Sequence, residues 1–406
     1  MSARQRTTDA GREQLAETLR PLSVDEFIAN AWGRTHELIK GQPGKFAHLL
    51  PWAQLNTILR QHRLDFPRLR LARDGKSLPA SAYLRHVRNS RKQTTVPRLL
   101  ADKLTEQLRQ GATLVLDAVD ELFEPLEQLA AGLERFFRVH VQINAYAGWR
   151  TSRGFDLHWD DHDVFILQVA GRKDWRVYGE TRPAPLVEDI EPAAKPTGEP
   201  LWAATLAAGD LLYIPRGWWH VALPLDEPTL HLTVGIHNRT GIDLLRWLVD
   251  NLRTSETARR DLPRFASAAE QRAHAARLRS ELTTAFNDDL LARYFAAQDA
   301  IAVPRPRLNL PWGAMPDAPP LTDDARVRLV APRPLEFHIK DGVVEFSCLK
   351  KRWRFAEAAL LVLRPLADGH AHTLAELCTA ARERLDERTV RALLVELSAH
   401  GLITQV

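Results

Sequence analysis

The spacing of apolar residues divides the chain into three parts. Between Val139 and Asn238 the sequence consists of short segments rich in β-branched and aromatic residues, and turn residues separate them. The segments are VHVQINAY, DVFILQVAG, DWRVYG, GDLLYIPRG, WWHVAL and TLHLTVGIH. Short strands at hairpin-like spacing predict an antiparallel β-barrel or jelly roll.

The segments that flank this predicted barrel are mixed or helical. Upstream, Ser23 followed by Glu26 is typical of a helix N-terminus, so we expect the fold to begin near residue 20, after a polar leader. PRLRLARDG alternates like a strand that ends in a turn, and EPLEQLAAGLERFF has helical spacing. From residue 241 the apolar period predicts a pair of helices, followed by a proline-rich connector. The C-terminal segment predicts a helix, a turn, a helix and a short strand, which is the order of a winged helix.

Composition narrows the class of protein. The chain has 406 residues, of which 45% are hydrophobic, so it can build two or three globular domains. Its net charge of +4 is too small to indicate a polybasic nucleic-acid tail. Cys348 and Cys378 lie apart and predict neither a disulfide framework nor a thiolate metal site. No run approaches the roughly 20 apolar residues of a membrane helix, and the polar N-terminus lacks a secretory signal pattern. We therefore expect a cytoplasmic protein.

The stretch DLHWDDHDVFILQVAGRKDW carries the candidate chemistry. If a strand begins there, His158 and Asp160 point the same way, about 7 Å apart. His220, at the end of GDLLYIPRGWWH, could join them after a Pro-Arg-Gly turn. Two histidines and one carboxylate on one side of an ion leave positions open, as non-haem Fe(II) oxygenases require. The alternative interpretation is an exposed strand edge with no metal.

Other polar residues nearby have open interpretations. Lys173, on the next predicted strand, could bind the distal carboxylate of 2-oxoglutarate, or it could be an exposed hairpin lysine. His162 shares the face of His158 but lies about 13 Å along the strand, too far to bind the same ion. It could contact a substrate. His231 and His237 are interpreted as hydrogen-bonded structural histidines.

The motifs FDLHWDDHDVFILQVAGRKDWRVYG, GDLLYIPRGWWHVA and LHLTVG resemble those of the JmjC-type ribosomal oxygenases. These are cupin-like, Fe(II)- and 2-oxoglutarate-dependent dioxygenases that hydroxylate side chains of ribosomal proteins. The resemblance implies an α+β fold, with a double-stranded β-helix (jelly-roll, cupin/JmjC) core, a helical dimerisation domain and a C-terminal winged helix. The implied segments are a disordered leader (1–19), a JmjC catalytic domain (20–240, barrel core from about 138), the dimerisation domain (241–303), a proline-rich linker (304–335) and a winged-helix-like domain (336–406).

The resemblance also implies roles for individual residues. The metal-binding and catalytic triad of the family falls on His158, Asp160 and His220, and its carboxylate-binding basic residue falls on Lys173. Fe(II) is the implied cofactor and 2-oxoglutarate the implied cosubstrate. The implied reaction is hydroxylation of an arginine or histidine side chain in a ribosomal protein, catalysed by a homodimer.

Two further pocket residues follow from the same resemblance. A polar and an aromatic residue on the first barrel strand line the cofactor pocket of the family, and they match Asn144 and Tyr146 in INAY. Ordinary strand packing is the alternative interpretation of both.

Other functions stay open at this point. The same chemistry could act on a peptide natural product or a small molecule, or the chain could be a non-catalytic cupin and winged-helix binding protein. Direct DNA binding is not expected. The recognition helix that would start at Asp386 carries Glu387 and Glu396, with only Arg388 and Arg391 as bases.

Overall fold

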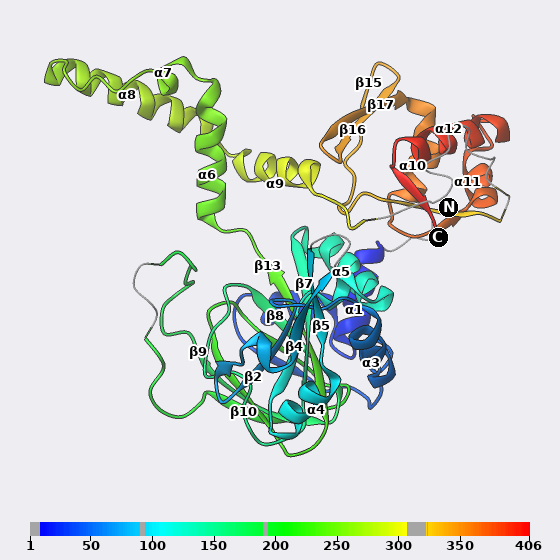
Figure 1. Cartoon of the computed structure of the whole chain (residues 1–406). Helices are drawn as coiled ribbons and strands as arrows, with labels where there is room; N and C mark the ends of the chain where they lie inside the picture. Colours follow the sequence, from blue (N-terminus) through cyan, green and yellow to red (C-terminus); the bar gives the residue numbers. More distant parts are fainter. Residues whose placement is uncertain (1–8, 90–93, 190–193, 307–321, 323) are drawn as a thin grey trace. The chain divides into compact units, whose positions relative to one another are not determined.

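The computed structural model describes residues 9–89, 94–189, 194–306, 322 and 324–406. The chain divides into two compact units, and the division falls between Asn238 and Arg239. The first unit contains the predicted strands, and the second begins with the predicted helices (Figure 1).

Two antiparallel β-sheets form the core of the first unit. Its strands are β1 (Glu37–Ile39), β2 (Leu69–Arg73), β3 (Lys76–Ser77), β4 (Leu84–Asn89), β5 (Thr94–Leu99), β6 (Thr113–Leu116), β7 (His140–Gly148), β8 (Asp163–Ala170), β9 (Arg172–Gly179), β10 (Trp202–Ala207), β11 (Leu211–Ile214), β12 (Trp219–Pro224) and β13 (Thr229–His237). The larger sheet has the order β1-β11-β8-β13-β7-β6-β2-β3, and the smaller has the order β10-β9-β12. β4 and β5 form a separate hairpin. All six segments predicted as strands are confirmed.

The sequence of β8 shows how the sheets are packed. Val164 and Ile166 contact apolar residues of the smaller sheet, whereas Phe165 and Leu167 join the core beneath the helices of the unit. Both faces of this strand are therefore covered, which explains why it is apolar at almost every position. Burying the two faces holds the smaller sheet against the larger one, as in a jelly roll.

β7 is polar on one face only. Its buried positions alternate with half-buried ones, and Val141, Ile143 and Ala145 contribute to the helix-covered core. Asn144 and Tyr146 fall on the opposite face. Because side chains of a strand alternate in direction, these two residues turn toward the space between the sheets.

Five α-helices accompany the sheets: α1 (Ala10–Leu19), α2 (Val24–Asn30), α3 (Trp52–Gln61), α4 (Ala101–Arg109) and α5 (Glu124–Phe137). Short 3₁₀ turns, η1 (Ala80–Ala82) and η2 (Val119–Glu121), precede α4 and α5. The predicted start of α2 is confirmed, since the Ser23 hydroxyl accepts a hydrogen bond from the Glu26 backbone N–H. The predicted helix EPLEQLAAGLERFF is α5.

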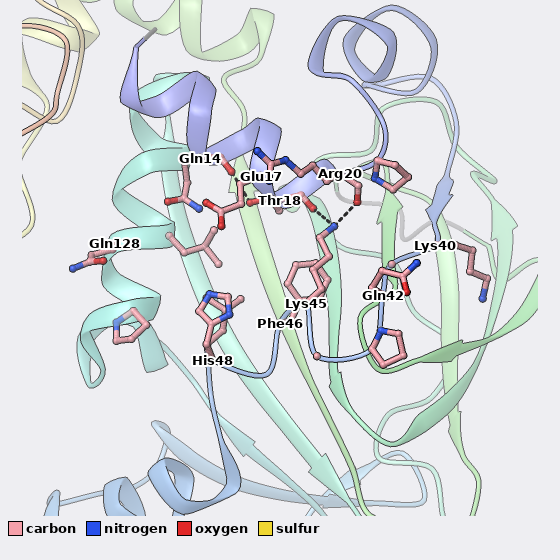
Figure 2. Close-up of a pocket in the computed structure, with 17 residues that line it drawn as sticks. Gln14, Glu17, Thr18, Arg20, Lys40, Gln42, Lys45, Phe46, His48 and Gln128 are labelled. Atoms are coloured by element: carbon pink, nitrogen blue, oxygen red, sulfur yellow. Dashed lines mark hydrogen bonds between the residues drawn. The ribbon is translucent and has the colours of Figure 1, made fainter. Parts of the chain in front are cut away.

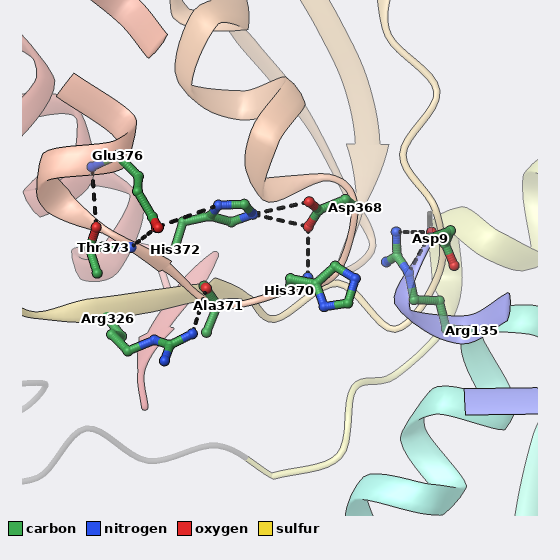
Figure 3. A network of polar contacts seen from close by, with 9 residues as sticks. All are labelled: Asp9, Arg135, Arg326, Asp368, His370, Ala371, His372, Thr373 and Glu376. Atoms are coloured by element: carbon green, nitrogen blue, oxygen red, sulfur yellow. Dashed lines mark hydrogen bonds and ion pairs between the residues drawn. The ribbon is translucent and has the colours of Figure 1, made fainter. Parts of the chain in front are cut away.

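The expectation of a disordered leader over residues 1–19 is wrong for its second half, because α1 begins at Ala10. Leu15 and Leu19, one helical turn apart, are fully buried, and α1 packs against α5. Asp9 caps the helix and accepts a forked pair of hydrogen bonds from Arg135 of α5 (Figure 3). Two leucines among polar residues are a weak indication of a helix. The helix is ordered because it packs against α5, and the local sequence does not predict this contact.

A lysine from the loop after β1 binds the C-terminal end of α1. The Lys45 ammonium donates to the carbonyl oxygens of Thr18, at 2.8 Å, and Arg20, at 2.6 Å (Figure 2). These carbonyls have no further helical N–H to accept from, so a cation is a suitable partner. Burial lowers the pKa of Lys45 to about 8.

The second unit starts with helices α6 (Gly241–Asn251), α7 (Glu256–Arg259), α8 (Ala268–Ala285) and α9 (Leu290–Ile301), with η3 (Leu252–Thr254) after α6. The sequence predicted two helices here, and the structure contains four. Breaks at Ser255 and Ser267, each of which caps the next helix, divide the segment. α6 and α9 contact each other through Trp247 and Tyr294, whose rings lie 5.5 Å apart.

The C-terminal part of this unit has its own apolar core. Its elements are β14 (Arg326–Leu329), β15 (His338–Lys340), β16 (Val343–Cys348), β17 (Lys351–Ala356), η5 (Glu357–Ala359), α10 (Leu360–Leu366), β18 (His372–Thr373), α11 (Leu374–Ala381), α12 (Glu387–Ala399) and β19 (Ile403–Gln405). The predicted helix, turn, helix and strand are α11, α12 and β19. Thr373 and Glu376 begin α11 with a capping box (Figure 3).

The predicted linker over 304–335 needs a correction at its end. β14 lies inside that range and pairs with both β18 and β19. Val327 and Leu329 are buried in the C-terminal core, so the strand belongs to this module. The sequence did not predict this strand, because it has only four residues, follows a proline-rich stretch and pairs with strands that come much later in the chain. Most of the proline-rich stretch itself, residues 307–321 and 323, lies outside the described residues.

Candidate active site

A cavity of about 230 Å³ lies between the two sheets of the first unit. Its walls come from the larger sheet, from β9 and β12 of the smaller sheet, and from the segment that leads into β8. The lining residues are Arg70, Thr113, Asn144, Tyr146, Gly154, Phe155, His158, Asp160, His162, Val164, Ile166, Lys173, Trp175, His220, Ala222, His231 and Thr233. All six residues that the sequence singled out as catalytic, metal-binding or cofactor-binding therefore line one cavity.

His158, Asp160 and His220 converge at one side of the cavity. The Asp160 carboxylate lies 3.5 Å from Nε2 of His220 and 4.0 Å from Nε2 of His158. The two imidazole rings have centroids 4.5 Å apart. One possible ligand atom from each of the three residues lies within 4.8 Å of the others.

The two imidazoles reach this position through backbone pairing, not through a shared strand. His158 exchanges two backbone hydrogen bonds with His220, at 2.8 and 3.2 Å, in an isolated bridge ahead of β8. The prediction that His158 and Asp160 open a strand is therefore wrong, since β8 begins at Asp163. Asp163 is buried and accepts hydrogen bonds from Tyr213 and Asn238.

Backbone carbonyls fix the orientation of both rings. Nδ1 of His158 lies 2.8 Å from the carbonyl oxygen of Asp156, and Nδ1 of His220 lies 2.9 Å from that of Trp218. A ring that donates from Nδ1 presents an unprotonated Nε2, which is the atom that faces Asp160. Burial, followed by the charge of His158, lowers the pKa of His220 to about 4, so this ring is neutral at physiological pH.

The turn before His220 holds Asp160 in place. The Gly217 N–H donates to the backbone carbonyl of Asp160 at 2.9 Å. Gly217 has φ of +84°, and a Cβ atom there would lie 2.5 Å from Pro185. Position 217 in the sequence PRGWWH thus requires glycine, because its φ is positive and a side chain would overlap with Pro185.

The set of donors fits a divalent transition metal. Two imidazoles, whose rings are oriented by backbone carbonyls, and one carboxylate are the ligands of the facial triad that leaves other positions of the ion open. His158, Asp160 and His220 are the residues that would hold such an ion.

Lys173 lies farther along the cavity. On β9, Lys173 pairs with Pro224 of β12, whereas Val177, four residues later, pairs with His220, so the lysine and that histidine are separated by roughly 13 Å of strand. Lys173 is only 5% exposed, and burial lowers its pKa to about 7. Within the described ranges, no carboxylate forms an ion pair with it. The interpretation as an exposed hairpin lysine is wrong.

Asn144 and Tyr146 face the cavity beside Lys173 and the triad. The Tyr146 ring stacks on the His231 ring, with centroids 4.9 Å apart and planes 5° apart. Oδ1 of Asn144 accepts from the Ala118 N–H at 2.9 Å, so part of this side chain supports the loop before α5. Burial raises the pKa of Tyr146 well above its ordinary value, and the phenol stays protonated.

Sequence reasoning missed several lining residues. Trp175 shares the strand face of Lys173 two positions later, so alternation along β9 could have found it. His231 was interpreted as structural, yet it lines the cavity, and its Nδ1 has no hydrogen-bond partner among the described residues. Arg70 and Thr113, on β2 and β6, carry no motif that would have revealed them.

The chain is similar to several known proteins. Residues 119–244 match the family model described as the JmjC domain. Ribosomal oxygenase 1 of Gallus gallus is 32% identical over 238 residues, which cover 56% of this chain and 38% of that protein. The bifunctional lysine-specific demethylase and histidyl-hydroxylase NO66 of Drosophila pseudoobscura pseudoobscura is 26% identical over 250 residues, covering 58% of this chain and 24% of that protein. The chain thus spans well under half the length of these relatives.

A solved structure matches over nearly the whole chain. The ribosomal oxygenase YcfD of Escherichia coli superposes with a TM-score of 0.56 at 20% identity, covering 95% of this chain and 98% of that one. Its structure in complex with cobalt and 2-oxoglutarate gives a TM-score of 0.57 at 19% identity, with the same coverage. At this identity the likeness establishes the fold.

The first unit is therefore built around a JmjC domain with a cupin-like core. The chain is similar to the ribosomal oxygenases in sequence and in fold, and the resemblance predicted from its motifs is confirmed. None of the described helices is both long enough and apolar enough to cross a bilayer.

Proposed function

We propose that this protein is an Fe(II)- and 2-oxoglutarate-dependent dioxygenase that hydroxylates a side chain of a ribosomal protein. One observation carries the proposal: three possible metal ligands and a buried lysine, which has no carboxylate partner among the described residues, line one cavity. 2-Oxoglutarate, a keto acid with two carboxylates, suits both groups. Its keto-acid end can chelate a metal ion, and its distal carboxylate can pair with the lysine ammonium. The similarity to YcfD, which has been crystallised with cobalt and 2-oxoglutarate, supports this assignment.

Each residue has a defined task in this proposal. His158, Asp160 and His220 hold the iron and leave its remaining positions to the cosubstrate and to O₂. Lys173 pairs with the distal carboxylate, and Asn144 and Tyr146 close the cavity beside it. Trp175 and His231 exclude water from the same wall. When bound, iron and 2-oxoglutarate would supply the oxidising chemistry that inserts oxygen into an unactivated C–H bond. The protein positions these groups and excludes water from the cavity.

The substrate class rests on the relatives. Two of them are named as a ribosomal oxygenase and a histidyl-hydroxylase, which supports a histidine side chain of a ribosomal protein, with arginine as the alternative residue. We propose that the reaction takes place in the cytoplasm. The deciding experiment measures succinate release by the purified chain with Fe(II), 2-oxoglutarate and ribosomal proteins, and follows a mass gain of one oxygen atom by mass spectrometry. Release only with a small peptide or metabolite would support the alternative substrate, and no release with any substrate would leave a non-catalytic binding protein.

We also propose that helices α6, α8 and α9 form a dimer contact. Large apolar side chains on them are about half exposed: Ile242, Leu245, Val249, Leu282, Phe286, Leu291 and Phe295. Leu248, Leu290 and Tyr294 are already buried within the chain, so they cannot serve this contact. A two-fold contact, in which one patch meets its own copy, would cover the exposed set.

Light scattering tests this contact. The wild-type protein should have about twice the chain mass of 45.9 kDa, and Phe286→Asp combined with Leu245→Asp should shift it toward the monomer. Leu201→Asp, which places a charge at an exposed leucine of the first unit, is the matched control. A wild-type chain that is monomeric at micromolar concentration contradicts the proposal.

The C-terminal module is proposed to be a winged-helix-like packing or substrate-presenting module and not a DNA reader. α12, the helix that would read DNA, presents Glu387 and Glu396, and Glu387 already pairs with Arg391 at 2.8 Å. This leaves little positive charge for phosphates.

A further inference from the structure

A second group of possible metal ligands lies beyond the first triad, at the rim of the same cavity. It consists of Asp161, His162 and His237, and one possible ligand atom from each lies within 4.8 Å of the others. His162 also lines the cavity, whereas Asp161 is exposed. None of these residues belongs to the triad of His158, Asp160 and His220.

The register of β13 explains how His237 comes to lie there. His231 and Thr233 line the cavity, and residues two apart on a strand share a face, so Gly235 and His237 continue this face toward the end of β13. Across the ladder, His237 pairs with His140 of β7, and the two rings stack with centroids 5.7 Å apart.

Gly235 makes room for the ring of His162. A Cβ atom built on Gly235 would lie 2.7 Å from Cδ2 and Nε2 of His162, so the imidazole lies directly against the bare backbone of β13. From this position its centroid is 4.4 Å from that of His237. A side chain at position 235 would overlap with the His162 ring and displace it.

The side chains of Asp161 and His162 already lie at the spacing of two ligands of one ion. Nδ1 of His162 is 2.8 Å from Oδ1 of Asp161, so these two atoms could bind one ion side by side. On the other side, Nδ1 of His140 lies 3.2 Å from Oε1 of Glu134, which fixes the ring that stacks on His237. Glu134 therefore supports the cluster indirectly and does not bind the ion.

We propose that Asp161, His162 and His237 form a second site for a divalent transition metal, separate from the triad. Two imidazoles with one carboxylate select Co²⁺, Ni²⁺ or Zn²⁺ over Mg²⁺ and Ca²⁺, which take all-oxygen ligand sets. An ion there ties the residues after Asp160 to β13 and so fixes the rim of the cavity. The proposal does not depend on the oxygenase assignment, because it concerns metal binding alone.

The experiment counts cobalt ions on the tag-free full chain, stripped by a chelator and then dialysed against excess Co²⁺ without 2-oxoglutarate. The wild-type chain should bind two ions, Asp160→Ala one, His237→Ala one, and the double variant none. Gly235→Ala removes no ligand but displaces His162, so it should also reduce the count to one. His62→Ala, at an exposed histidine outside both clusters, is the matched control and should bind two.

The outcomes separate the two sites. A wild-type chain that binds one ion, lost in Asp160→Ala and kept in His237→Ala, overturns the second site and leaves the triad intact. One ion that is lost in His237→Ala and kept in Asp160→Ala supports the second site and argues against the triad. Circular dichroism checks folding, and if His237→Ala does not fold, Asp161→Asn takes its place with the same expected loss of one ion.

Discussion

The charged side chains at the two ends of the cavity differ in whether they have a partner within the chain. At the triad, the Asp160 carboxylate lies between two imidazoles, and backbone carbonyls fix both rings. At the other end, Lys173 is buried, and no carboxylate pairs with it in the part of the chain that the structure describes. Buried charges are costly unless they are paired. The triad is therefore organised before any ligand arrives, whereas the lysine end becomes complete only when an anion binds.

This difference separates two kinds of variant. Under the proposed function, changes at the triad should remove the reaction centre, and changes near Lys173 should weaken the binding of 2-oxoglutarate while the centre stays in place. The expected effects can be ordered by size.

The largest effect should follow Asp160→Ala. Loss of residues that only support metal ligands already costs about 10- to 100-fold, so loss of a ligand should reduce succinate release more than about 100-fold. Asp174→Ala, at a carboxylate that bonds Thr205 on the smaller sheet, is the matched control and should keep wild-type turnover. Near wild-type turnover by Asp160→Ala would mean that the triad is not the reaction centre.

Lys173→Ala should act mainly on the concentration of 2-oxoglutarate that the enzyme needs. Without the ammonium, a buried carboxylate is left unpaired at a cost of about 3 kcal/mol, which raises the apparent KM roughly 100-fold. The metal count should not change. Arg176→Ala, at an exposed residue of the same strand, should leave the KM unaltered. An unchanged KM in Lys173→Ala would assign the distal carboxylate to a different cation, and Arg70, which pairs with Asp117, is the other cationic residue among those that line the cavity.

A pH effect should distinguish the two ends further. Burial lowers the pKa of Lys173 to about 7, so the ligand-free lysine loses its proton as the pH rises above that value. Binding of an anion favours the protonated form, and the apparent KM for 2-oxoglutarate should therefore be flat below pH 7 and rise up to about tenfold per pH unit above it. Lys173→Ala should abolish this rise. A wild-type KM that stays constant from about pH 7 to about pH 9 would contradict a lysine with a lowered pKa.

The smallest effect should come from Tyr146→Phe. The phenylalanine ring would still stack on His231, and only the hydroxyl would be lost. Losing one hydrogen bond from this hydroxyl to 2-oxoglutarate costs about 1 kcal/mol, which should raise the KM for 2-oxoglutarate about fivefold. Titrations of 2-oxoglutarate at saturating iron give this value. A loss as large as that of Lys173→Ala would show that the phenol contributes as much to 2-oxoglutarate binding as the ammonium does.

The sequence by itself determined the elements and most of the chemistry. Alternation along β7, the continuous apolar run of β8 and the turn residues between strands are local properties, and they predicted the jelly roll. Residue types and spacing likewise singled out His158, Asp160, His220 and Lys173, which line the cavity as predicted.

Only the tertiary structure decided how these residues meet. His158 pairs with His220 across sixty-two positions of sequence, and Lys173 is buried because β9 lies in a sheet that packs against β8. The meeting of His162 with His237 over Gly235 depends in the same way on where the chain enters β8 beside β13. Strand pairing and burial are set by contacts between distant segments, and no local spacing of residues contains them. For the same reason the sequence did not predict α1, because its two leucines are buried only where the helix packs against α5.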